Sequence, residues 1–168
     1  MGELSRENFY AKIVTAPRAV QGFFETVIEH FNKRNDIHAH HTDTNGGDLR
    51  LALPAELARH HTIRNFSTLC WQSRNQKIFV RSYLTPEEMA VFGFAGVKIP
   101  RNINEPLHSE LRLGELDWRY RAQDFIRASE AAALKMMGCA WISFLLLKCS
   151  ITVSKKPCTA RGAVTIFA

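Results

Sequence analysis

The sequence predicts an α+β fold: an antiparallel sheet of three to five strands, with a helix at each end of the domain packed on one face. Three patterns predict it: a helical apolar period near the N-terminus, alternating strand patterns in the middle, and a second helical period that ends near residue 137. Helices grouped at the ends of a run of strands are typical of this class. The 168 residues, 46% of them apolar, suffice for one core and exclude a disordered chain.

The first long helix is predicted over Thr15–Lys33. Thr15 is a suitable N-cap, and Pro17 suits the first turn, where a missing N–H is tolerated. A short helix over Ser5–Val14 is expected to precede it. Apolar residues then recur at spacings of three and four, which indicates one face packed on a core: Val20, Phe23, Phe24, Val27, Ile28 and Phe31.

Strand patterns begin after a turn predicted at Asn45–Asp48, because Asn and Gly tolerate positive φ. Leucines alternate with other residues over Leu49–Leu53, which predicts a half-buried strand that ends at Pro54. Two further strands, Asn65–Gln72 and Lys77–Leu84, are separated by four residues. This spacing is typical of a β-hairpin.

Side chains alternate between the faces of a strand, so the second hairpin strand has two distinct faces. One face carries Ile78, Val80, Ser82 and Leu84, and the other carries Lys77, Phe79, Arg81 and Tyr83. Beyond the hairpin, Thr85–Glu88 is predicted to begin a short helix with acidic residues in its first turn.

The segment 93–114 contains two prolines and several glycines, so we predict it to be loop. Asp117 is then expected to cap the second long helix. The apolar face of that helix is formed by Ala122, Phe125, Ile126, Ser129, Ala133 and Met136.

The chain is divided by its charge into a domain over residues 1–137 and a C-terminal extension over residues 138–168. The extension carries four of the six net positive charges and no acidic residue. Its apolar run, Met136–Leu147, is twelve residues long, whereas a membrane-spanning helix needs about 20. We therefore expect no membrane span. The chain opens without a signal-peptide pattern, and the four cysteines have no paired metal-site spacing, so we expect reduced thiols and a cytoplasmic protein.

A basic and aromatic hairpin surface is the leading candidate site. We expect Trp71 and Tyr83 to stack on bases, and Arg74, Lys77 and Arg81 to contact phosphates. The sequence thus predicts a small module that binds DNA or RNA, rather than an enzyme, with no cofactor. The alternative for such strands is a face covered by a helix, with the cations at its rim.

Two other function classes remain open. Five of the seven histidines lie between His38 and His61, and on a strand His38 and His40 would share a face. The second function class is therefore a metal-dependent hydrolase or nuclease that uses Asp48 with His40 and His41. The spacing matches no established metal motif, and exposed loop histidines are the simpler interpretation. The third class is a protein-interaction or homodimer subunit that uses the apolar extension.

The order of the predicted elements, together with the phrase Asn65-Phe66-Ser67-Thr68-Leu69, resembles small bacterial α+β domains of the YjbR-like "double wing" type. The resemblance covers roughly residues 10–137. It implies an α+β fold and a binding role, since DNA binding has been suggested for such domains. It assigns no functional residue.

Overall fold

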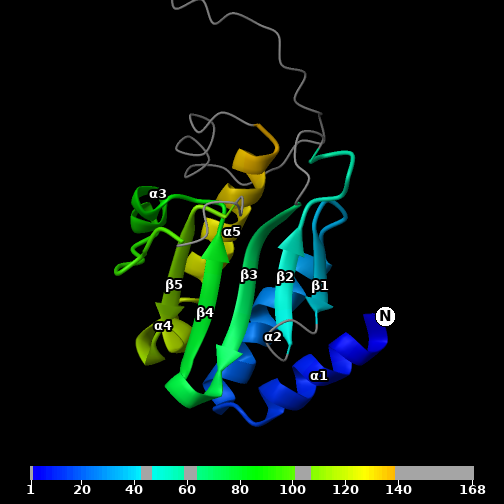
Figure 1. Cartoon of the computed structure of the whole chain (residues 1–168), viewed down its shortest axis with the longest axis vertical. Helices are drawn as coiled ribbons and strands as arrows, with labels where there is room; N and C mark the ends of the chain where they lie inside the picture. The colour runs from blue at the N-terminus through cyan, green and yellow to red at the C-terminus, as the bar shows by residue number, and fades with distance from the viewer. Residues whose placement is uncertain (1, 43–46, 59–63, 101–106, 139–168) are drawn as a thin grey trace, which may run out of the picture.

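The computed structural model describes residues 2–42, 47–58, 64–100 and 107–138, and it shows an α+β fold. Five strands form one sheet in which each strand is antiparallel to the next, and the order in space is the order in the chain (Figure 1). The strands are β1 (His38–Thr42), β2 (Asp48–Ala52), β3 (Asn65–Gln72), β4 (Lys77–Ser82) and β5 (Ser109–Leu113). The expected antiparallel sheet is confirmed.

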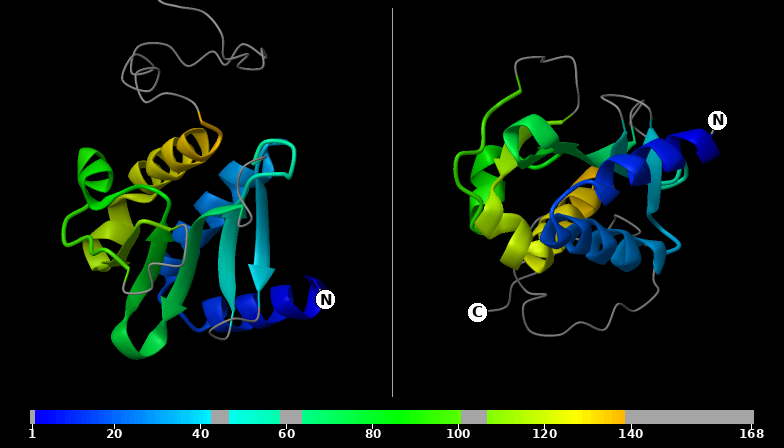
Figure 2. Two further views of the ribbon diagram at one scale, coloured as in Figure 1. Left: turned by 45° about the horizontal axis from the view of Figure 1, so that its top comes forward. Right: turned by 90° about the horizontal axis from the view of Figure 1, so that it is seen from below.

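Five helices accompany the sheet in the described ranges. They are α1 (Gly2–Val14), α2 (Arg18–Asn32), α3 (Pro86–Val91), α4 (Glu115–Tyr120) and α5 (Ala122–Met136). The long helices α2 and α5 pack together on one face of the sheet, as the sequence predicts for helices at the two ends of the domain (Figure 2). Helix α1 crosses the end of the sheet beside β1.

The core lies between the sheet and the two long helices. Strand register places Leu49, Leu69, Val80 and Leu111 side by side in one cross-strand row, and all four are buried. Helix α2 covers this layer with the apolar face that its spacing predicts, formed by Val20, Phe23, Phe24, Val27 and Phe31. Side chains at three- and four-residue spacing lie on one side of a helix, so the sequence period suffices to predict this contact.

Two predicted helix starts need correction. Helix α2 begins at Arg18 after Pro17, and the Thr15 hydroxyl instead donates to the Lys12 carbonyl at 2.8 Å, at the end of α1. Asp117 lies inside the short helix α4, where its Oδ2 accepts from the Gly114 N–H at 2.9 Å. Helix α5 therefore begins later than predicted, at Ala122.

Strand β5 corrects the prediction that residues 93–114 are all loop. Its five residues alternate between the core and the opposite face, and they pair with β4 along their whole length. A strand this short forms because it pairs with a neighbouring strand, so prolines nearby in the sequence do not predict whether it forms. The hairpin and the capped start of α3 are confirmed: Thr85 Oγ1 accepts from the Glu88 N–H, and Glu88 Oε2 accepts from the Thr85 N–H.

Some sequence predictions concern residues outside the described ranges: Asn45 and Gly46 of the predicted turn, His60 and His61, and the extension beyond Gly138. In the ranges that are described, none of the helices has both the length and the apolar character that crossing a bilayer requires. The domain boundary at residue 137 and the cytoplasmic location stay predictions.

Candidate nucleic-acid interface

The face of the sheet opposite α2 and α5 is lined by polar and charged side chains, and it is turned toward the viewer in Figure 1. We call it the open face. It is formed mainly by His38, His40, Arg50, Thr68, Lys77, Phe79, Arg81, Glu110 and Arg112. These residues alternate along their strands with the buried core residues, which places them on the other side of the sheet.

One row of residues crosses the open face from β1 to β5. Register aligns His40, Arg50, Thr68, Arg81 and Glu110 in that order. Lys98 extends the row, because its backbone pairs with that of Glu110 through two hydrogen bonds of 2.8 Å. Neighbours in such a row have Cβ atoms roughly 5 Å apart. The row thus contains two arginines, a lysine and one acid, Glu110, which lies between Arg81 and Lys98. Glu110 Oε2 is 3.7 Å from Arg81 Nε.

The Phe79 ring lies between two arginine side chains on the open face. The guanidinium carbons of Arg81 and Arg112 are each 5.5 Å from the centroid of the Phe79 ring. The ring is partly exposed, and Arg112 is exposed. Contacts of this kind hold guanidinium groups against the face of an aromatic ring.

The β1 edge of the open face is also electropositive. Partial burial lowers the pKa of His40, and the charges of Arg50, His38 and Arg64 lower it further. His40 therefore remains neutral at neutral pH, and its lowered pKa reports the positive field of the neighbouring arginines. The strand register places His38 and His40 on the same face, as the sequence predicts.

The five predicted contact residues separate into four places, of which one is the core position of Trp71. Arg81 lies centrally on the open face, whereas Arg74 and Lys77 are exposed at the β3–β4 turn. Tyr83 lies beyond the end of β4, where its ring centroid is 4.8 Å from that of His108 and 5.6 Å from Lys135 Nζ. Burial and the Glu88 carboxylate raise the pKa of Tyr83.

The expectation for Trp71 is wrong. Trp71 pairs with Ile78 in the hairpin, so it lies on the core face, and its exposed fraction is only 1%. A ring buried in this way is not available to stack on a base. Cys70, the neighbour of Trp71, pairs instead with Phe79, and Phe79 is an aromatic residue that lies on the open face.

The sequence-based site also missed Arg50, Arg112 and Lys98. Arg50 lies between Leu49 and Leu51, so strand alternation alone could have assigned it to the face opposite the core. Arg112 lies in the segment predicted as loop, whose prolines mask the strand alternation. For Lys98 the sequence contains no signal, because its place depends on pairing with Glu110.

One end of the open face is closed by α1. Lys12 Nζ donates to Cys70 Sγ at 3.2 Å, and the side chain of Asp48, only 2% exposed, lies close to the same thiol. Burial raises the pKa of Cys70, and hydrogen bonding to Asp48 raises it further. Cys70 is therefore a protonated, structural thiol at neutral pH.

The metal-site alternative does not fit the geometry of β1. His40 lies on the open face, whereas His41 lies on the other side of the strand, where its ring stacks on Phe9 at 4.5 Å. Adjacent residues of a strand point to opposite faces, so these two rings do not converge on one ion with Asp48. Among the residues that the structure describes, no three His, Cys, Asp or Glu side chains gather as a metal site requires.

No protein-family model, curated protein or solved structure matches this chain. The resemblance to YjbR-like domains therefore stays a prediction.

Proposed function

We propose that the protein binds single-stranded nucleic acid across the open face of its sheet. The observation that carries this proposal is the row of cations that crosses the sheet with a single acid in it. Lys and Arg that neutralise phosphates supply most of the affinity of nucleic-acid-binding proteins. Four of the six net positive charges lie in the extension, so the domain that carries the open face has a net charge of +2, which has the sign that such a partner requires.

The side chains of the open face divide into two roles. Arg50, Arg81 and Arg112 contact successive phosphates, and Lys77 extends the cationic path toward the hairpin turn. Phe79 stacks on an unpaired base. Stacking of this kind contributes about 1–3 kcal/mol per base and tolerates any sequence. We therefore expect weak sequence preference and strong salt dependence.

The shape of the sheet favours a single strand over a duplex. Five strands spaced about 4.8 Å apart make a face roughly 19 Å wide, which exceeds the major groove width of about 12 Å. Such a face cannot enter the groove of B-form DNA. An extended single strand can lie on it and present its bases to Phe79.

The test is fluorescence-anisotropy binding of the full chain to short single-stranded and duplex oligonucleotides at two salt concentrations. The variant Lys77→Ala/Arg112→Ala removes two exposed cations of the open face. We expect weaker single-strand binding and a salt slope lower by about 1.4, since each lost phosphate contact removes about 0.7.

The matched control is Arg18→Ala, which removes an exposed cation from the start of α2, on the helical side of the molecule. We expect it to leave the affinity and the slope unchanged. Equal losses per removed charge in the two variants would show attraction by net charge rather than by the open face. Absence of binding by the wild-type chain at low salt would refute the proposal.

A further inference from the structure

The β1 edge of the open face carries two histidines beside an arginine. Register pairs His40 on β1 with Arg50 on β2, and His38 lies two residues before His40 on the same face. Residues paired in this way have Cβ atoms roughly 5 Å apart. Both histidines are exposed, as is Arg64, the residue that precedes β3. Because β1 is the last strand of the sheet on this side, the group is open to a ligand that lies across the sheet.

The charged groups that act on His40 within the described residues are all basic. Partial burial lowers the pKa of His40, and the charges of Arg50 on β2, His38 on β1 and Arg64 before β3 lower it further. A hydrogen bond to the backbone of His38 acts in the opposite direction. No carboxylate is among these groups, so no acid in the described part of the chain stabilises protonated His40.

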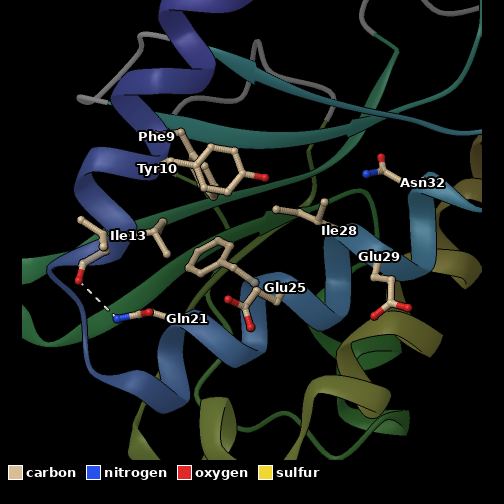
Figure 3. A pocket seen from close by; sticks show the side chains of 10 residues that line it. Phe9, Tyr10, Ile13, Gln21, Glu25, Ile28, Glu29 and Asn32 are labelled. Atoms are coloured by element: carbon tan, nitrogen blue, oxygen red, sulfur yellow. Dashed lines mark hydrogen bonds between the residues drawn. The ribbon is translucent and has the colours of Figure 1, made fainter.

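The two helices that pack against β1 act on its other side. Phe9 and Tyr10 of α1 contact the ring of His41, and the charge of Arg6 on α1 adds to burial in lowering the pKa of His41. The same two rings line a groove of about 500 Å³ between α1 and α2 (Figure 3). Two acids line this groove from the α2 side: Glu25 and Glu29. None of these helical charges is among the groups that act on His40.

Bound phosphate reverses the electrostatics at this edge. In the free protein the neighbouring cations repel a proton on His40, so the ring is neutral at neutral pH. A phosphate beside Arg50 attracts that proton, and a protonated imidazole has two N–H groups that donate to phosphate oxygens. Hydrogen bonds between charged partners are roughly twice as strong as neutral ones. Phosphate binding and proton binding therefore strengthen each other, by linkage.

We propose that His38 and His40 form, together with Arg50, a phosphate subsite that is completed when the imidazoles are protonated. The ligand is a phosphodiester group of the single strand, so this inference rests on the proposed function of the open face. The subsite lies at the opposite end of the cationic row from Lys98. The affinity of the open face for single strands then rises as the pH falls.

Fluorescence anisotropy of the full chain with single-stranded oligothymidylate, at pH 7.5 and pH 5.5 and at matched ionic strengths, tests the proposal. The bases of this probe keep their charge over that range. We expect the wild-type chain to bind about tenfold more tightly at pH 5.5, a difference of about 1.4 kcal/mol. Its salt slope should steepen by about 0.7 for each histidine that becomes charged.

The variant His38→Gln/His40→Gln changes two exposed positions and removes both imidazoles of the subsite. It should bind like the wild-type chain at pH 7.5 and lose most of the gain at pH 5.5. His30→Gln is the matched control, since His30 lies on α2 and pairs with Glu130 at 3.0 Å on the helical side of the molecule. The control should keep the full gain.

The inference and the proposed function fail in different ways. Wild-type binding that is no tighter at pH 5.5 would overturn the inference, as would an equal gain in the wild-type chain and the His38→Gln/His40→Gln variant. In both cases the protein still binds single strands, so the proposed function stands. Absence of binding at both pH values and at low salt would refute the proposed function, and the subsite with it.

Discussion

At the residue scale, Arg121 shows how one side chain holds a junction together. Its guanidinium donates to the carbonyls of Phe92 at 2.6 Å and Gly93 at 2.9 Å, and it lies 4.3 Å from the centroid of the Phe94 ring. It also pairs with Asp117 at 3.2 Å and Asp124 at 3.1 Å. Arg121 thus joins the chain after α3 to the start of α5.

We expect Arg121→Ala to destabilise the fold by about 2–4 kcal/mol, because hydrogen bonds to a charged group contribute about 1.5–3 kcal/mol and the ring contact adds roughly another 1. Urea denaturation measures the change. Arg119→Ala is the control: Arg119 pairs with Glu115 on the exposed surface of α4, and such pairs contribute about 0–1 kcal/mol. Similar losses in both variants would contradict the role assigned to Arg121.

At the element scale, the start of α3 is set by local sequence. Thr85 and Glu88 form the reciprocal capping box that the sequence indicates, and Pro86 occupies the first turn. Tertiary contacts then fix the helix in place, because Lys135 Nζ of α5 donates to both Glu88 oxygens at 2.6 and 2.9 Å. Glu88 therefore serves the cap and the contact between helices at once.

Thr85→Ala should lower the free energy of unfolding by about 1 kcal/mol, the usual contribution of an N-cap side chain. Thr85→Ser keeps a hydroxyl at the same position and should restore most of the loss. Thermal and urea denaturation of the three proteins compare these values. If the serine variant were as unstable as the alanine variant, the hydroxyl would not be the stabilising group.

At the scale of the whole molecule, three histidines link stability to pH. Partial burial lowers the pKa of His40, His41 and His108, and nearby cations lower the pKa of each of them further. In the unfolded chain these groups return to a pKa of about 6.5. The unfolded chain therefore binds more protons below that pH, and the stabilisation present above pH 6.5 is lost as the pH falls.

We accordingly expect the free energy of unfolding to decrease between pH 7.5 and pH 5, as measured by urea denaturation. Lowered carboxyl pKa values, such as that of Asp36 beside Arg34, affect only more acidic conditions. His108→Gln changes an exposed position and should make the pH dependence shallower. A stability that is constant or rises on acidification would show that these histidines are not held neutral by the fold.

The candidate site was only partly predictable from sequence. Arg81 and Lys77 were found because strand alternation within one strand is a local pattern. The face on which Trp71 lies depends on its pairing with Ile78. Arg112 lies on the open face because it belongs to β5, a strand that the prolines nearby in the sequence obscure. Pairing between strands joins residues far apart in the chain, so local patterns do not determine it.

The sequence by itself determined the apolar face of α2, the hairpin and the capped start of α3, because helix period, strand alternation and caps depend on residues a few positions apart. The tertiary structure alone decided that β5 is a strand, that Phe79 rather than Trp71 lies on the open face, and that α1 and α2 enclose a groove. These features depend on contacts between distant segments, which form only when the whole core is assembled.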